Sequence, residues 1–284
     1  MFGVRLSKLG SASKLGLIAK AIAILRSYGA DAHIYLPGVG TINGITAGNY
    51  LDSAGTTAAS VDNPVGLSLD GLGAWEDVPQ NWVKASGDGV VTAVGNTITI
   101  TGATTTTRVD LSPAHPFVDG YLKAEFTVTW SSATSVYVYI AGGASVPVNG
   151  TRTTYGISSK NSALDLVQID SGTATFVIHS LRLNRGIFAS QATTANKALL
   201  KSAAGKYWWQ FDSTDLLTAT YPAGYESATI INALTSGVTT NQGVNVVGSY
   251  SIGPSVNTAG RILLKTAPTA EELAVLQSFM GLLI

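Results

Sequence analysis

Few residues in this sequence have the types and spacing that catalysis needs. The three histidines, His33, His115 and His179, lie in different segments. The sequence contains no G-x-x-x-x-G-K-[ST] phosphate loop, no H-E-x-x-H and no G-x-S-x-G. A metal site or triad shared by the histidines is therefore not expected, and ordinary core or surface histidines are the favoured interpretation. Nothing in the residues indicates a cofactor.

Two pairs of neighbouring carboxylates were candidates for acid–base or metal chemistry. Asp165 and Asp170 have opposite parity along a predicted strand, so their side chains should face opposite ways and not form a glycosidase pair. Asp212 and Asp215 could bind calcium, but capping of a turn is the favoured interpretation. We therefore expect a protein that is not an enzyme, with no metal site.

Exposed aromatic side chains are the remaining chemical feature, because sugar rings stack on aromatic faces. Tyr137 and Tyr139 share the strand face opposite Val136 and Val138, where they could form a glycan platform or, as we favour, contact a subunit or a second sheet. Trp130 falls on the apolar face of its strand, so a core position is expected. The candidates for glycan or interface contacts are Tyr137, Tyr139, Trp208 and Trp209.

Trp208 and Trp209 are consecutive residues of a short aromatic strand. Successive side chains of a strand point to opposite faces. One of these two indoles is therefore expected outside the fold or at an interface.

The elements that must position these residues are mostly strands with alternating side chains. Residues 121–130 alternate most cleanly, with Leu122, Phe126 and Val128 on one face and polar residues on the other. Gly, Ser and Asn turns separate such segments, which is typical of an antiparallel β-sandwich. The expected strands include 90–101, 121–130, 135–140, 164–169, 174–183, 207–211, 229–234, 244–247 and 260–264.

Two helices are expected, one near each end of the sequence. Residues 13–28 are predicted to be helical, ending at Gly29, and a capping box at Thr269 opens a short helix that ends near Gly281. The first helix has two interpretations: it packs on its own domain, or it is an anchor that inserts into a larger assembly. The apolar residues proposed for the anchor are Leu17, Ile18, Ile22 and Leu25.

The composition points to association and away from nucleic acid. Charged residues make up only 12% of the chain, against about 25% in ordinary globular proteins. Lys and Arg total 17, and so do Asp and Glu, which leaves no basic footprint for a nucleic-acid partner. No apolar run is long enough to insert into a membrane, and there is no cysteine. We expect a homo-oligomer.

Several phrases of the sequence resemble phage and prophage tail-fibre or appendage proteins that carry a concanavalin-like (laminin-G-type) sandwich. The resemblance covers about half of the chain. It rests on YLDSAGTT at 50–57, NPVGLSLD at 63–70, QATTANK at 191–197, YWWQFD at 207–212, GRILL at 260–264 and AEELAVL at 270–276.

The segment between these phrases resembles the carbohydrate-binding-module-like jelly rolls of the same proteins. It opens with NWVKASG at 81–87 and closes with VIHSLRL at 177–183. The resemblance implies a helical anchor at 1–29, a discontinuous concanavalin-like sandwich formed by 30–75 plus 188–284, and an inserted jelly roll at 76–187. The outer sandwich is shorter than usual, so it could be reduced or completed by neighbouring subunits.

The first functional hypothesis is a virion structural protein, a tail fibre, head fibre, spike or decoration, assembled in the host cytoplasm. It would dock to other virion proteins through its N-terminus and display its sandwiches, possibly for host attachment. The resemblance to phage tail-fibre proteins implies a homotrimer. The alternative is a carbohydrate-binding adhesin module that recognises host-surface glycans, and a polysaccharide depolymerase ranks third.

Overall fold

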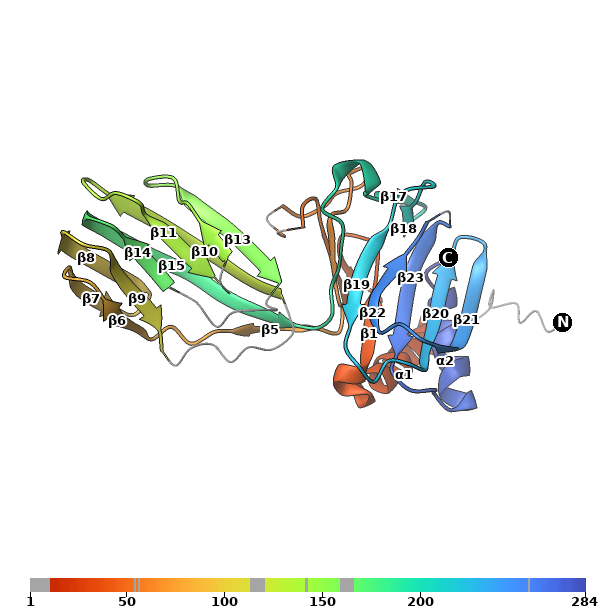
Figure 1. Cartoon of the computed structure of the whole chain (residues 1–284). Helices are drawn as coiled ribbons and strands as arrows, with labels where there is room; N and C mark the ends of the chain where they lie inside the picture. The colour runs from red at the N-terminus through yellow and green to blue at the C-terminus, as the bar shows by residue number, and fades with distance from the viewer. Residues whose placement is uncertain are drawn as a thin grey trace. The chain divides into compact units, whose positions relative to one another are not determined.

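The computed structural model describes residues 11–53, 55, 57–112, 121–140, 143–158, 166–254 and 256–284. The chain forms two compact units, drawn in Figure 1. Unit 1 contains the described residues up to Ser53, together with Thr57–Gly73 and Ile187–Ile284, and unit 2 consists chiefly of Ala74–Gly186. One continuous segment is therefore inserted into a unit whose parts are far apart in sequence.

The predicted fold class, mainly antiparallel β-sandwich with an N-terminal helix and a short C-terminal helix, is confirmed. Unit 1 has two sheets. Sheet I contains β17 (Leu199–Ala203), β18 (Lys206–Gln210), β23 (Thr258–Leu264), β20 (Ala228–Leu234) and β21 (Gly237–Val244), and β1 (Ala32–Tyr35) also pairs with β23. Sheet II contains β2 (Gly40–Ile42), β3 (Ile45–Tyr50), β4 (Leu67–Leu69), β16 (Ala189–Ser190), β19 (Leu217–Tyr221) and β22 (Gly248–Ile252).

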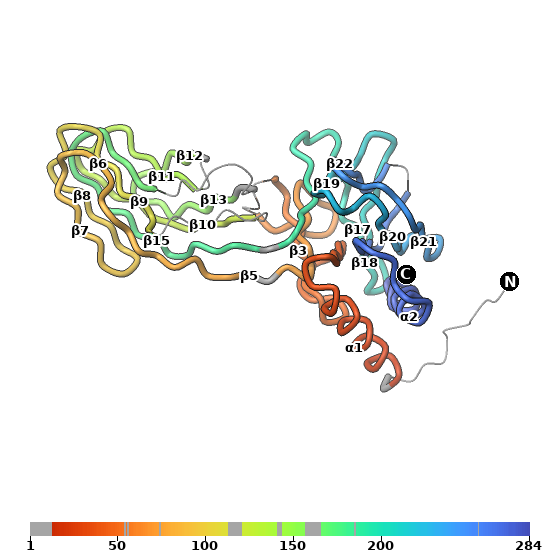
Figure 2. Tube along the Cα trace, turned by 60° about the horizontal axis from the view of Figure 1, so that its bottom comes forward, coloured from red at the N-terminus to blue at the C-terminus, as the bar shows by residue number. Residues whose placement is uncertain are grey.

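Unit 1 has three layers, because sheet I is buried on both faces. One face packs on sheet II through residues such as Trp209, Ile230 and Leu263. The other face packs under the helices α1 (Ser11–Ser27) and α2 (Ala270–Gly281), which lie side by side in Figure 2. Strands buried on both faces are apolar at consecutive positions, and β20 and β23 are buried along almost all of their length.

The N-terminal helix packs on its own unit. Leu25 is fully buried, while Leu17, Ile18 and Ile22 are half-buried, and Ile18 and Ile22 pack on the helix-covered core. Lys20 forms an ion pair of 2.8 Å with Glu271 of α2. These contacts agree with the interpretation that the N-terminal helix packs on its own domain. Docking of this helix to other proteins stays a prediction. No helix of the described residues has the length and hydropathy to cross a bilayer.

The capping box at the start of α2 is confirmed. The Thr269 hydroxyl accepts from the Glu272 backbone N–H at 3.3 Å, and the Glu272 carboxylate accepts from the Thr269 N–H at 2.9 Å. This second bond contributes most to lowering the pKa of Glu272.

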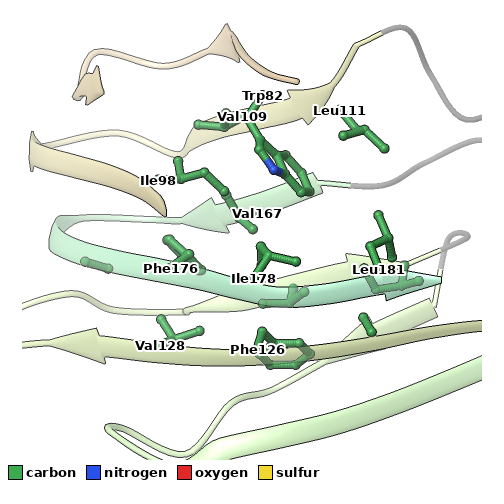
Figure 3. Packing of buried hydrophobic residues seen from close by; sticks show 14 of the residues in the cluster. Trp82, Ile98, Val109, Leu111, Phe126, Val128, Val167, Phe176, Ile178 and Leu181 are labelled. Atoms are coloured by element: carbon green, nitrogen blue, oxygen red, sulfur yellow. The ribbon is translucent and has the colours of Figure 1, made fainter. Parts of the chain in front are cut away.

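Unit 2 is a sandwich of two further sheets. Sheet III contains β13 (Arg152–Ser158), β10 (Tyr121–Trp130), β15 (Gly172–Arg185), β8 (Thr97–Ala103) and β7 (Val90–Val94), and β5 (Ala74–Asp77) also pairs with β15. Sheet IV contains β12 (Gly143–Ser145), β11 (Tyr137–Ile140), β14 (Leu166–Ile169), β9 (Thr107–Leu111) and β6 (Trp82–Ser86). Their inner faces form one apolar core, in which Phe126, Phe176 and Ile178 are fully buried (Figure 3).

Two predicted strands differ from the structure. The stretch 90–101 is a hairpin, because Gly95 takes a positive φ of 58° between β7 and β8. Of the predicted strand 244–247, Val244 ends β21, and residues 245–247 form the connection to β22, in which the buried Val246 side chain packs into the core between sheets I and II. Leu164 and Asp165, at the start of the predicted strand 164–169, lie outside the described residues.

Candidate functional site

A small apolar pocket lies on unit 2 where β10 ends and β11 begins. Its volume is about 200 Å³, and its lining includes Trp130, Val136, Tyr137, Val146 and Pro147. Trp130 and Tyr137 are both half-buried, so each side chain keeps part of its surface free. The expected core position of Trp130 is therefore corrected: as the last residue of β10, it packs on the edge of the core and lines the pocket.

One asparagine holds the loop that carries Val146 and Pro147 against the end of β10. The Trp130 backbone N–H donates to Asn149 Oδ1 at 3.1 Å, and Asn149 Nδ2 donates to the Trp130 carbonyl at 2.8 Å. The Gly150 N–H adds a bond of 2.8 Å to the Val128 carbonyl. These bonds take the place of the pairing between β10 and β13, which ends at Thr127, and they hold the pocket wall against β10.

The opposite wall is the loop that leads into β11. Thr134 is tied to Ser171 by a backbone bond of 3.1 Å and by a bond of 2.8 Å between the two hydroxyls. Asp170 N–H donates to the Thr134 carbonyl at 3.0 Å. One loop of the pocket is therefore anchored to β10, and the other to the turn between β14 and β15.

Tyr137 and Tyr139 lie on the outer face of sheet IV, as the alternation predicts, while Val138 and Ile140 are buried. Their ring centroids are 5.8 Å apart and the ring planes meet at 43°. Tyr137 thus belongs both to the pocket and to an aromatic pair that extends across the sheet face.

Polar side chains continue this face on the neighbouring strands. Gln168 of β14 lies opposite Tyr137, and Arg108 of β9 lies opposite Gln168. Arg108 binds Asp110 through both ends of its guanidinium, at 2.6 Å and 3.0 Å, and this hydrogen bonding raises the pKa of Arg108. The outer face of sheet IV therefore offers aromatic surface beside amide, guanidinium and carboxylate groups. We call this surface, together with the pocket residue Trp130 of sheet III, the aromatic face (Trp130, Tyr137, Tyr139, Gln168, Arg108 and Asp110).

The aromatic face contains one ion pair, between Arg108 and Asp110. Its one carboxylate, Asp110, is engaged by Arg108. Within the described part of the chain, no group of three or more His, Asp or Glu residues is arranged to hold a metal ion.

Of the two tryptophans, Trp209 is not available for glycan or interface contacts, whereas such a contact for the half-buried Trp208 stays a prediction. Trp209 is fully buried between sheets I and II, where its Nε1 donates to Asn49 Oδ1 at 3.1 Å. Trp208 does point the other way, but there it packs half-buried on the core under the helices. The alternation was correct, but α1 and α2 cover the face that was expected to be open.

Sequence reasoning missed a buried polar cluster in unit 1. His33 Nδ1 lies 2.8 Å from Asp70 Oδ2, and His33 Nε2 lies 2.8 Å from the Tyr225 hydroxyl. Asp70 Oδ1 also accepts from the backbone N–H groups of Ile34 and Leu72, at 2.9 Å and 3.0 Å. Burial raises the pKa of Tyr225. With His33 and Asp70 only 3% exposed, the cluster is structural, and no local pattern could have joined residues 37 and 192 positions apart.

The other candidates from the sequence have structural explanations where they are described. His179 Nε2 lies 2.9 Å from the Thr127 hydroxyl at the surface, and His115 lies outside the described residues. Asp212 Oδ1 accepts from the N–H groups of Thr214 and Asp215, at 2.7 Å and 2.9 Å, and these bonds lower its pKa. The turn-capping interpretation of Asp212 and Asp215 is confirmed.

Comparison with known proteins gives little. No family model matches the chain, and no curated protein matches it. Among solved structures, it is similar to the N-terminal CBM22-1-CBM22-2 tandem domain from Paenibacillus barcinonensis Xyn10C, at 10% sequence identity and a TM-score of 0.24. That similarity covers 71% of this chain and 92% of the other. A likeness at this TM-score supports no conclusion about a ligand.

Proposed function

We propose that the chain is a non-catalytic carbohydrate-binding protein that holds glycans on the aromatic face of unit 2. One observation carries this proposal: Trp130 and Tyr137 line the same apolar pocket, and anchored loops form its walls. Ligand sites are typically concave and preformed, with apolar walls and a few polar groups that fix orientation.

The aromatic face matches the two kinds of surface that a sugar presents. The C–H face of a pyranose is apolar and can lie on Trp130 or Tyr137, while its hydroxyls need hydrogen-bond partners. Gln168, Arg108 and Asp110 provide donors and acceptors on the adjacent strands. The ion pair between Arg108 and Asp110 leaves these residues with no net charge, which favours neutral glycans over acidic ones.

Replacing Trp130 or Tyr137 with Ala is expected to weaken glycan binding at least tenfold. Loss of a buried aromatic contact at a binding hot spot costs about 2 kcal/mol or more, and about 1.4 kcal/mol corresponds to a factor of ten. The full chain is first screened on a glycan array, and the best ligand is then titrated by calorimetry.

Trp75→Ala is the matched control, because Trp75 is a half-buried indole of unit 2 that packs on Tyr121 and Arg182 instead. This variant should bind like the wild type. The carbohydrate-binding proposal would be rejected if no glycan on the array bound the protein. Equal affinity of the Trp130→Ala, Tyr137→Ala and Trp75→Ala variants would also reject it.

The second candidate is a phage virion structural protein, and one feature favours the self-association that it requires. The outer face of sheet III carries a patch of Thr and Val without charge, which we call the threonine face. It consists of two rows across β7, β8, β15 and β10: Thr92, Thr99, Thr175 and Thr129 in one, and Val94, Thr97, Val177 and Thr127 in the other.

The threonine face supports a homo-oligomer, because an uncharged sheet face can pack on its own copy without burying unpaired charge. A trimer is the state suggested by the resemblance. In a virion, the N-terminal segment would contact other particle proteins, and the displayed sandwiches would bring many weak glycan sites together.

Thr92→Arg is expected to shift the full chain from oligomer to monomer in size-exclusion chromatography with light scattering. Thr92 is exposed on the edge strand β7, so the charge leaves the fold intact but would be buried in an interface. Thr220→Arg, at an exposed position of β19 in unit 1, is the control. A wild-type monomer at high concentration would count against this candidate, and so would an oligomer unaffected by Thr92→Arg.

A further inference from the structure

A second pocket, in unit 1, brings two lysines together. It has a volume of about 270 Å³ and includes Lys14 of α1 and Lys206 of β18 in its lining, together with Asn43, Tyr207 and Leu282. The lining contains no carboxylate. We call it the lysine pocket.

Two tight hairpin turns build the rim of the lysine pocket. Asn43 and Gly44 join β2 to β3 with φ values of 48° and 81°, and Ala204 and Gly205 join β17 to β18 with φ values of 50° and 73°. Two consecutive positive φ values are the pattern of the two-residue turn that matches strand twist. These turns place Asn43 and Lys206 at the pocket by rigid backbone geometry.

Helix capping explains part of this arrangement, but not all of it. Lys206 Nζ donates to the carbonyl of Leu282, the residue that caps the C-terminus of α2. A lysine ammonium has three donors, so two remain for another partner. Lys14 is exposed, and within the described part of the chain no carboxylate pairs with it. Capping therefore accounts for Lys206 and leaves the presence of Lys14 unexplained.

The two positive charges act on each other. The pKa of Lys206 is lowered, first by burial and second by the charge of Lys14. Two positive charges that line one pocket without a counter-charge are stabilised by a bound anion.

We propose that the lysine pocket binds a small oxyanion, a phosphate or a carboxylate group, between Lys14 and Lys206. Lysine acts as a point charge toward such groups. Asn43 and Tyr207, which line the same pocket, add an amide and a hydroxyl that can donate hydrogen bonds. This site is separate from the aromatic face, which lies on the other unit.

Titration of the full chain tests the proposal, with inorganic phosphate and glucuronate as the probes and sodium chloride at equal ionic strength as the reference. The backbone amide signals of Asn43 and Gly205 should shift saturably with phosphate, with glucuronate or with both. Preference for one probe distinguishes a phosphate group from a sugar carboxylate. The Lys206 ammonium should titrate at higher pH when the anion is bound, which a purely capping lysine would not do.

Lys14→Gln is expected to weaken anion binding at least tenfold. Lys20→Gln is the matched control, because Lys20 lies on the same helix but pairs with Glu271 outside the pocket. No saturable shift beyond that with chloride would overturn the proposal, and so would equal binding by Lys14→Gln. Trp130→Ala should keep the anion site, so failure of the glycan proposal and failure of this one remain distinguishable.

Discussion

Trp209→Ala is expected to lower the free energy of unfolding of unit 1 by about 3–5 kcal/mol, the range for truncating a buried aromatic residue. Trp209 is the largest fully buried side chain of the described residues. Its indole lies 6.5 Å from the Phe211 ring, centroid to centroid. The substitution opens a cavity between sheets I and II, and its alanine leaves Asn49 Oδ1 without the indole donor.

Trp209→Ala should also affect Asn49, because the Trp209 indole donates a hydrogen bond to its side chain. Asn49 Nδ2 donates to the carbonyls of Leu36 and Gly38, at 2.8 Å and 3.1 Å. The indole therefore orients an amide that ties β3 to the chain after β1. Trp209→Phe keeps most of the volume and removes only the donor, so it should cost less than Trp209→Ala.

Hydrogen exchange followed by mass spectrometry at increasing urea measures the two units separately, which is needed because a two-unit chain need not unfold in one step. Peptides of unit 1 should lose protection at lower urea in Trp209→Ala, while peptides of unit 2 keep theirs. Trp208→Ala is the control, since Trp208 is only half-buried and should cost less. An equal cost for the two tryptophans would contradict the difference in burial between Trp209 and Trp208.

Asp70→Ala is expected to destabilise unit 1 by about 3 kcal/mol or more, because each buried donor left without a partner costs about 1–3 kcal/mol. Asp70 accepts from two backbone N–H groups and lies against His33, all in a region closed to solvent. Removing the carboxylate leaves these donors buried without a partner. The same urea series on unit 1 measures the loss.

Asp62→Ala provides the comparison for Asp70→Ala. Asp62 pairs with Lys201 at the same donor–acceptor distance of 2.8 Å, but its side chain is 70% exposed. Solvent screening limits such surface pairs to about 1 kcal/mol or less. Adding His33→Ala to Asp70→Ala should cost less than the sum of the two single changes, because the residues share one network. Additive costs would show that His33 and Asp70 are not coupled.

The uncharged threonine face also bears on the unusual composition. A chain with 12% charged residues has few ions to spread over its surface. On sheet III two rows of outward positions across four strands hold only Thr and Val, whose hydroxyl and methyl groups suit a pleated, half-buried surface. The uncharged surface of this protein therefore includes a patch whose residues are known. Single substitutions in this patch test whether the protein self-associates.

Local patterns predicted the elements of this fold well. Alternation along 121–130 identified β10 and its buried face, because the period of two depends only on strand geometry. The capping box at Thr269 correctly located the start of α2. This signal is also local, since both of its partners lie within one helical turn. The pairing of Tyr137 and Tyr139 on one face was also local information.

Only the tertiary structure decided which predicted surfaces stay open. The alternation of Trp208 and Trp209 was local, but two helices from opposite ends of the chain cover the face under Trp208. Trp130 became part of a pocket because Asn149, 19 residues later, holds a loop against it. His33, Asp70 and Tyr225 meet from three distant segments. Sequence patterns describe contacts within one strand or one helical turn. The burial of a side chain also depends on which distant segments of the chain pack against it.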